Sequence, residues 1–115
     1  MARIEGKCKE VIEKADLKAL TNVETRDVEG VFISDMLSDV MTGAGAGNLW
    51  LTVQTHTNIV SAANLVDLAA VVITSGKELP QATIDLANRY HVVILSTPLK
   101  AFELTEKLIG IGLKP

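Results

Sequence analysis

The stretch LWLTVQTHTNIVSAANLVDLAAVVITSG, residues 49–76, decides the fold class of this chain. An apolar strand over 48–53 ends in the polar run Gln54-Thr55-His56-Thr57-Asn58. An apolar helix over 59–68 follows, and then a buried strand that ends in Thr74-Ser75-Gly76. A strand, a helix and a strand in this order indicate a crossover between parallel strands. Both polar runs should therefore lie at one edge of a parallel sheet, where α/β folds bind ligands.

The same alternation continues towards the N-terminus. Residues 6–15 predict a helix with Cys8 and Val11 on its inner face, and residues 17–21 predict a short strand. A polar loop over 22–29 leads into a buried strand at 30–33. Ser34 is a suitable cap for a short helix that runs to Met41. The glycines of 43–47 predict a turn, because a phosphate-binding loop needs a helix after it and a strand follows here.

The C-terminal half repeats the pattern twice more. Asn58 should cap the helix over 59–68, which is apolar nearly all round and therefore expected to be buried. Pro80 begins a helix that runs to Tyr90, and a strand over 92–95 follows. Thr97 and Pro98 begin a last helix with Phe102 on its core face. The whole pattern predicts one three-layer α/β/α domain, residues 1–115, with a mainly parallel sheet.

Composition excludes several classes of protein. Of 115 residues, 48% are hydrophobic and 3% aromatic, with a net charge of -3, so a nucleic-acid surface is not expected. Cys8 is the only cysteine in the sequence, which excludes an intrachain disulfide and a two-cysteine metal site. It should be a small core residue. We see no signal peptide and no apolar run long enough for a membrane span, so a cytoplasmic location is expected.

Four polar strand ends are candidates for a ligand site: Ser34-Asp35, Gln54–Asn58, Thr74–Gly76 and Ser96-Thr97. Hydroxyls, free backbone N–H groups and helix N-termini attract a phosphate, a carboxylate or a nucleotide. The alternative is that these residues only cap helices. Trp50 and Phe32 are expected in the strand core, and Met36 and Met41 are expected to pack the short helix.

His56 is the best single candidate for chemistry, as a general base or a metal ligand. One histidine makes neither a triad nor a metal site, and His91 precedes a strand at the opposite edge of the sheet. Asp35 and Asp39 are explained by their places at a helix start. We therefore expect no catalytic residues, no metal and no cofactor. A small enzyme with His56 as base and Asp35 beside it is the catalytic alternative.

Residues 69–108 resemble the N-terminal domain of bacterial HPr kinase/phosphorylase, and the chain from Asn48 onward resembles the related DRTGG domain. The shared layout is an apolar strand ending in Thr-x-Gly, a proline at a helix start, an Ala-rich helix, a strand and Ser-Thr-Pro-Leu. Thr55-His56 stands where the family has Asp-Arg, and Thr74-Ser75-Gly76 where it has Thr-Gly-Gly. The P-loop of the kinase domain is absent, so kinase activity does not transfer.

The resemblance implies a regulatory or ligand-sensing module that is often dimeric. Our main hypothesis is a non-catalytic homodimer that binds a small anionic ligand such as a nucleotide. The proposed contacts are Gln54, Thr55, His56, Thr57, Asn58, Thr74, Ser75, Gly76, Ser96 and Thr97. The rival is a structural subunit that binds a protein partner without a ligand, with the apolar tail of 109–113 as its contact. Short relatives accompany hydrogenase systems, which suggests such a context.

Overall fold

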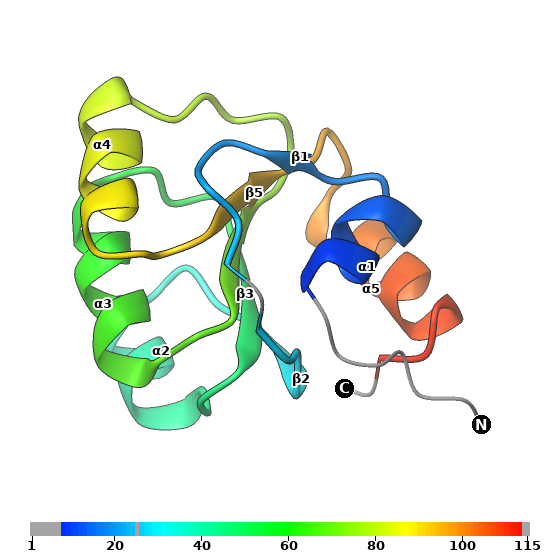
Figure 1. The fold of residues 1–115 in the computed structure, drawn as a ribbon. Coiled ribbons are helices and arrows are strands. Elements are labelled where there is room, and N and C mark those ends of the chain that lie inside the picture. The colour runs from blue at the N-terminus through cyan, green and yellow to red at the C-terminus, as the bar shows by residue number, and fades with distance from the viewer. Residues whose placement is uncertain (1–7, 25, 114–115) are drawn as a thin grey trace.

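A five-stranded sheet with the order β1-β5-β4-β3-β2 runs through the molecule, and helices cover both of its faces (Figure 1). The computed structural model describes residues 8–24 and 26–113. The elements in chain order are α1 (Cys8–Lys14), β1 (Lys18–Ala19), β2 (Gly30–Ile33), α2 (Leu37–Gly43), β3 (Asn48–Thr52), α3 (Asn58–Val66), β4 (Ala70–Ile73), α4 (Gln81–Arg89), β5 (Ile94–Ser96) and α5 (Ala101–Gly110).

Strands β2, β3, β4 and β5 are parallel and lie side by side in chain order, while β1 joins β5 in the antiparallel direction. Because each right-handed crossover moves one strand along the sheet, α2, α3 and α4 all lie on one face. The chain then crosses to the other face, where α5 lies beside α1 (Figure 1). The mainly parallel sheet with helices on both faces confirms the predicted fold class, and the antiparallel β1 defines one edge.

Alternating side chains of the strands divide the core into two layers. Trp50 and Val71 face α2, α3 and α4, and Leu51 and Val72 face α1 and α5. Every residue of the central strands β3 and β4 except Asn48 is buried, so their near-continuous apolar runs reflect packing on both faces. The predicted core roles of Trp50 and Cys8 are confirmed, and Phe32 packs half-buried against the first layer.

Three predicted helix starts are wrong by one to three residues. Helix α2 begins at Leu37, because the Ser34 hydroxyl accepts a hydrogen bond from the Met36 N–H in the preceding turn. Helix α3 begins at Asn58 itself, and Thr57, at the N-cap position, makes no side-chain capping bond. Helix α5 begins at Ala101, with the chain around Pro98 outside the helix. In each case, bonds made by the connecting loop delay or advance the first helical turn.

The expected inner faces of several helices are also wrong. Phe102 is 88% exposed, because Leu104 and Leu108 face the sheet and Phe102 lies about 160° and about 120° round the helix from them. Leu65 on α3 is 68% exposed, since α3 packs on the sheet through one side only. The remaining exposed apolar side chains include Tyr90 and Ile33, and also Met36 and Met41, which were expected to pack the short helix.

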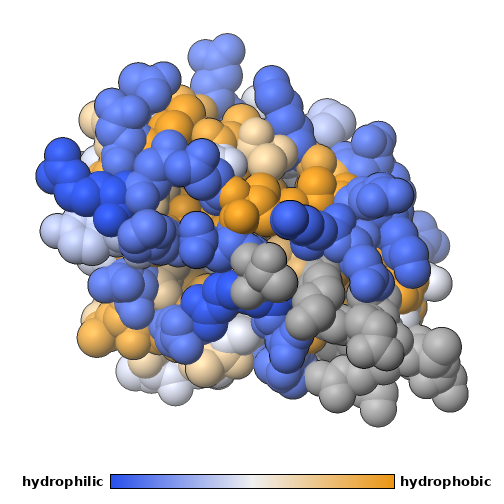
Figure 2. Space-filling view, viewed as in Figure 1, coloured by the Kyte–Doolittle hydropathy of each residue, from blue (hydrophilic) through white to orange (hydrophobic). Residues whose placement is uncertain are grey.

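Hydrophobic side chains consequently reach the surface in several separate places, each bordered by hydrophilic residues (Figure 2). Two of these places are hollowed. A groove of about 470 Å³ lies between α3 and α4, beside Leu65 and Tyr90. A smaller hollow of about 270 Å³ lies on α5, between Phe102 and Ile109. In the predicted tail, Leu113 is buried in the core while Ile109 is half exposed.

Candidate functional site

The polar ends of the four parallel strands lie at one edge of the sheet, as the sequence predicts. Parallel neighbours in the register Ile33↔Leu51, Thr52↔Ile73 and Ile73↔Ser96 end at nearly the same level. The loops that follow them therefore form one continuous rim. We call this rim, residues 34–35, 53–58, 74–77 and 96–100, the carboxyl edge.

At the β2 and β3 end of the carboxyl edge, Asp35 and Gln54 hold two loops together. Asp35 Oδ1 accepts hydrogen bonds from Thr52 Oγ1 at 2.8 Å and from the Val53 N–H at 3.0 Å. Gln54 Nε2 donates in return to the Asp35 carbonyl oxygen at 2.7 Å. The Asp35 carboxylate therefore binds strand β3 and does not act on the start of α2 as predicted. Gln54 has its amide N–H₂ group engaged in the same contact.

In the centre of the carboxyl edge, His56 supports the start of α3. Its Nδ1 accepts a hydrogen bond from the Asn58 N–H at 3.2 Å, so Nδ1 is the unprotonated ring nitrogen in this contact. The imidazole takes the capping role that the sequence assigns to Asn58, and the ring remains exposed. The carbonyl of Thr55 accepts from the buried Thr83 hydroxyl of α4 at 3.0 Å, which fixes this loop against the next helix.

Between β4 and β5, the two following loops turn towards opposite faces of the sheet, to α4 and to α5. Such a point, where neighbouring crossovers diverge, is the usual ligand crevice of a parallel sheet. Here hydrogen bonds join the two loops, from Ser75 N–H to the Leu99 carbonyl at 2.8 Å and from Gly76 N–H to the Thr97 carbonyl at 3.0 Å. The expectation of free backbone N–H groups is therefore wrong at these positions.

Thr74, Ser75 and Gly76 form a tight turn in which the backbone of Ser75 and that of Gly76 lie in the left-handed region. Ser75 has φ +62° and Gly76 has φ +67°. This conformation suits two successive glycines, and serine occupies the first of these positions at an energetic cost. The spacing of Thr74, Ser75 and Gly76 is thus explained by a turn in which the N–H groups of Ser75 and Gly76 bond to the loop after β5.

Thr74 and Thr97 of the carboxyl edge are buried, and their hydroxyls form hydrogen bonds within the edge. Thr74 is 1% exposed, and its Oγ1 donates to the Thr52 carbonyl at 3.4 Å. Thr97 is 3% exposed, and its Oγ1 accepts from the Leu99 N–H at 3.2 Å. Both side chains hold loops in place. Ser75 differs from them, because its side chain is exposed and its hydroxyl forms no hydrogen bond within residues 8–24 and 26–113.

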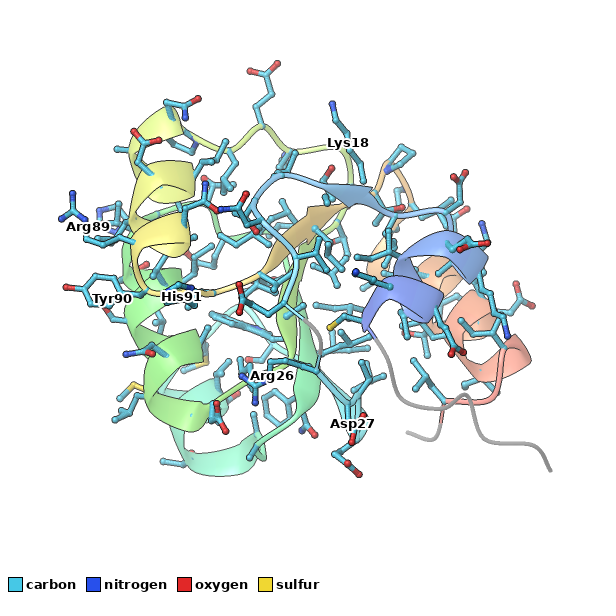
Figure 3. The ribbon with its side chains drawn as sticks, viewed as in Figure 1. Lys18, Arg26, Asp27, Arg89, Tyr90 and His91 are labelled. Carbon is cyan, nitrogen blue, oxygen red and sulfur yellow. The ribbon has the colours of Figure 1, made fainter. Side chains whose placement is uncertain are left out.

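Three lysines that sequence reasoning missed gather at the β4 and β5 end of the carboxyl edge. Lys77 follows the Ser75 turn, and Lys100 follows Leu99. Lys18 on β1 is the register partner of Ser96, the last residue of β5, and its side chain extends beyond the sheet (Figure 3). All three are exposed. Only the antiparallel pairing of β1 brings Lys18 here, although the two later lysines could have been noticed beside the polar runs.

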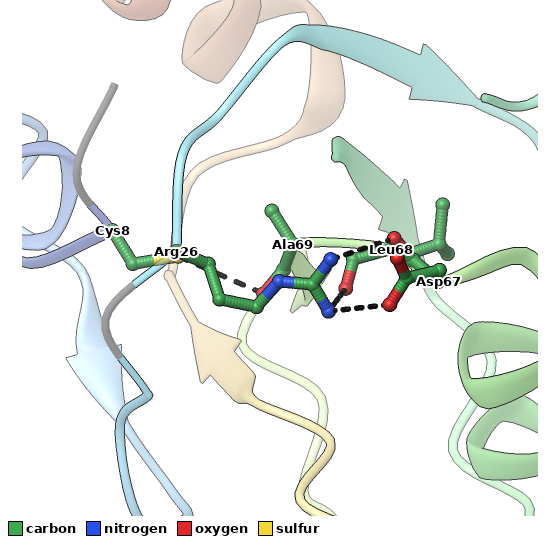
Figure 4. Close-up of polar contacts among 5 residues, drawn as sticks. All are labelled: Cys8, Arg26, Asp67, Leu68 and Ala69. Atoms are coloured by element: carbon green, nitrogen blue, oxygen red, sulfur yellow. Dashed lines mark hydrogen bonds and ion pairs between the residues drawn. The ribbon is translucent and has the colours of Figure 1, made fainter. Parts of the chain in front are cut away.

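The opposite edge of the sheet carries a structural ion pair. Arg26 Nη1 lies 2.8 Å from a carboxylate oxygen of Asp67 and 3.1 Å from the Leu68 carbonyl, and Nη2 donates to the Asp67 carbonyl at 3.1 Å (Figure 4). Asp67 ends α3 in the left-handed region, at φ 64°. Arg26 therefore joins the loop before β2 to the turn between α3 and β4.

Cys8 and His91 also lie away from the carboxyl edge. Burial raises the pKa of the Cys8 thiol, and the positive charge of Arg26 partly opposes the rise. The thiol contacts the Ala69 carbonyl oxygen at 3.6 Å (Figure 4). His91 lies before β5, with its Nδ1 3.6 Å from a Glu24 carboxylate oxygen, so the predicted separation from His56 is confirmed.

Within the part of the chain that the structure describes, no group of three or more His, Cys, Asp or Glu side chains is placed to hold a metal ion. No helix in the same part of the chain reaches the length and apolarity that a membrane span requires.

Comparison with known proteins finds no family model that matches the chain and no curated protein sequence that does so. Among solved structures, the fold is similar to the crystal structure of the CBS and DRTGG domains of the regulatory region of Clostridium perfringens pyrophosphatase, complexed with its activator diadenosine tetraphosphate. The TM-score is 0.74 at 15% sequence identity. This likeness supports a DRTGG-like fold.

The match covers 91% of this chain and 46% of the pyrophosphatase chain, so the protein spans about half the length of that regulatory region. At this identity the comparison establishes the fold alone. The resemblance to HPr kinase/phosphorylase stays a prediction.

Proposed function

We propose that this chain is a non-catalytic regulatory module that binds a small anionic ligand, such as a nucleotide, at the carboxyl edge and acts as a homodimer. The observation that carries the proposal is the gathering of Lys18, Lys77 and Lys100 where the β4 and β5 loops diverge. Lysine ammonium groups bind phosphate oxygens as point charges. They stand at the place where parallel sheets bind their ligands.

The charges along the carboxyl edge give the site a direction. Asp35 lies at its β2 end, with Asp39 close by on α2. The three lysines lie at its β4 and β5 end, where they outnumber two glutamates: Glu78 follows Lys77, and Glu103 Oε1 accepts a hydrogen bond from the Lys100 N–H at 3.1 Å. A phosphate group is attracted to the second end and repelled from the first. The ligand contacts that we predicted from the sequence divide accordingly: the exposed Ser75 hydroxyl lies beside the lysines, while Thr74 and Thr97 hold the loops beneath it.

Ligand chemistry receives indirect support from the structural neighbour, a regulatory region whose activator is a dinucleotide polyphosphate. A ligand of that class carries several negative charges and would match a three-lysine cluster. His56 and Asn58, exposed at the centre of the carboxyl edge, offer hydrogen-bonding groups to the rest of such a ligand.

Calorimetric titration with diadenosine tetraphosphate, ATP, ADP, AMP and inorganic phosphate tests the proposal. We expect binding of at least one nucleotide and a loss of about 10-fold or more in affinity for the double variant Lys77→Gln/Lys100→Gln. Lys9→Gln/Lys14→Gln on α1 is the matched control, because it removes the same charge from exposed positions elsewhere. Absence of binding by the wild type, or equal losses in both double variants, contradicts the proposal.

His56→Ala and Ser75→Ala separate hydrogen bonding from charge attraction. If both groups contact the ligand, each variant weakens binding by a similar factor at low and at high salt. The lysine variants lose most of their effect in high salt, because exposed charges are screened there. A purely electrostatic association with no fixed site would leave the His56 and Ser75 variants unchanged at every salt concentration.

The exposed side chain of Phe102 favours a second candidate function, a structural subunit that binds a protein partner without a ligand. A partner could come from a hydrogenase system, as the sequence resemblance suggests. Under this alternative, a stable complex forms from purified components without nucleotide. The complex would survive the double lysine variant and would be lost on substitution of Phe102 by a charged residue.

A further inference from the structure

Two backbone hydrogen bonds, which we call the turn bonds, hold the turn after β4 on the loop after β5. The Ser75 N–H donates to the Leu99 carbonyl oxygen at 2.8 Å. The Gly76 N–H donates to the Thr97 carbonyl oxygen at 3.0 Å. Successive backbone N–H groups at such a place in a parallel sheet are typical donors to an anion. Carbonyl oxygens of the chain itself therefore occupy the positions that ligand oxygens would take.

The two loops differ in how firmly the rest of the chain anchors them. On the β5 side, Thr97 is buried and the half-buried Leu99 packs against the core layer of α1 and α5. On the β4 side, residues 75–78 are all exposed, and we call them the β4 turn. A further bond at this turn, from the Lys77 N–H to the Thr74 carbonyl, is long at 3.5 Å. The β4 turn is thus the side that can move while the β5 loop stays in place.

The backbone of the β4 turn opposes the turn bonds. Ser75 has φ +62°, a left-handed conformation that is strained for a residue with a Cβ atom. Movement of the turn away from the β5 loop lets Ser75 return to the extended region and removes this strain. The strain and the net contribution of two neutral hydrogen bonds are of similar size. The closed turn is therefore favoured by a small difference in free energy, and strained segments of this kind gather at ligand sites.

We propose that the β4 turn controls access to the anion site by an exchange of hydrogen-bond acceptors. In the closed turn, the N–H groups of Ser75 and Gly76 bond to the β5 loop. In the open turn, they bond to phosphate oxygens of the ligand. Hydrogen bonds to charged oxygens are about twice as strong as those to carbonyls, so the ligand binds the open turn better and shifts the equilibrium towards it. This proposal rests on the proposed function and adds the regulation of its site.

The charges around the β4 turn make the two N–H donors necessary. Lys77 lies within the turn, and Lys100 follows Leu99 on the β5 loop. Glu78 and Glu103 reduce the positive charge at this end of the carboxyl edge. Exposed lysines that are partly neutralised in this way attract a phosphate weakly in salt. The ligand therefore needs the backbone donors as well, and it obtains them by opening the turn.

Scalar couplings across hydrogen bonds, measured by NMR on the isotope-labelled full chain, test this exchange because each coupling identifies one donor and one acceptor. We expect a coupling for each of the two turn bonds in the free protein. Saturating ATP or diadenosine tetraphosphate should abolish both couplings. The bond from the Ala69 N–H to the Asn48 carbonyl, 2.9 Å long at the opposite edge of the sheet, is the internal control and should keep its coupling.

Gly76→Ala tests the equilibrium of the β4 turn by a second route. An added Cβ would lie 3.9 Å from the Cα atom of Pro98, so it fits, but alanine is strained at the φ of +67°. The variant should therefore favour the open turn and raise the affinity for ATP by about 5-fold. Gly110→Ala, where nothing lies within 4 Å of the added Cβ, is the control and should leave the affinity unchanged. Ser75→Ala keeps the strained backbone and measures the contribution of the hydroxyl alone.

The possible results separate the acceptor exchange from the proposed function. Turn bonds that persist in the nucleotide-bound protein overturn the exchange and leave ligand binding intact. An affinity of Gly76→Ala equal to or below that of the wild type also overturns it, provided that the NMR spectrum shows a retained fold. Absence of binding by every nucleotide contradicts the proposed function itself, and the exchange fails with it.

Discussion

Replacement of Ser75 by glycine should stabilise the protein, although serine is the better residue in most loops. Ser75 has φ +62°, where a side chain with a Cβ atom costs about 1 to 2 kcal/mol. Glycine lowers that cost but makes the unfolded chain more flexible, which offsets about 0.4 to 1 kcal/mol. The side chain is exposed and makes no hydrogen bond among the described residues, so little else is lost. The net gain should be about 0.5 to 1 kcal/mol.

Thermal unfolding measures this gain directly. For 115 residues, the entropy of unfolding is about 0.24 kcal/mol/K, so 1 kcal/mol raises Tm by about 4 °C. Ser75→Gly should therefore raise Tm by about 2 to 4 °C. Ser61→Gly, at an exposed position inside α3, should lower Tm by about 2 °C because glycine is a poorer helix former than serine.

The reasoning would be refuted if both serine variants shifted Tm in the same direction. A fall in Tm for Ser75→Gly would mean that the Ser75 side chain stabilises the turn more than its backbone conformation costs. The variant also separates turn geometry from ligand contact, since glycine keeps the Ser75 N–H bond to Leu99 and removes only the hydroxyl. Nucleotide affinity that falls while stability rises would assign the hydroxyl to the ligand.

Three further outcomes follow from single contacts. Arg26→Ala should lower the free energy of unfolding in urea by about 2 kcal/mol, because two carbonyl bonds and an ion pair are lost, whereas the exposed Arg89→Ala should change it by less than about 0.5 kcal/mol. The raised pKa of the buried Cys8 thiol should make wild-type stability fall as pH rises above the ordinary value of 9.0, by up to about 1.4 kcal/mol per pH unit, and Cys8→Ala should remove this dependence. Asp35→Ala should cost about 1 to 3 kcal/mol by loss of an acceptor for two hydrogen bonds, and a change in urea midpoint no larger than that of Asp39→Ala would contradict this role.

Much of the carboxyl edge could be predicted from the sequence because it depends on local order. An apolar run that ends in polar residues places those residues at a strand terminus, and parallel strands put their carboxyl ends at one edge. The positions of Gln54, His56 and Ser75 followed from this rule. Their hydrogen bonds did not, because the partners Asp35 and Leu99 come from loops distant in sequence and depend on which strands are neighbours.

The sequence by itself determined that this chain alternates strands and helices, buries Val, Ile and Leu on both faces of a mainly parallel sheet, and ends its strands in hydroxyl and amide side chains. These properties are fixed by periodicity and by the backbone preferences of each segment. Only the tertiary structure decided which charges lie beside those strand ends. The pairing of β1 with β5 places Lys18 at the same edge of the sheet as Lys77 and Lys100, and the burial of Leu104 and Leu108 turns Phe102 outward. Both depend on contacts between distant segments, which local sequence does not specify.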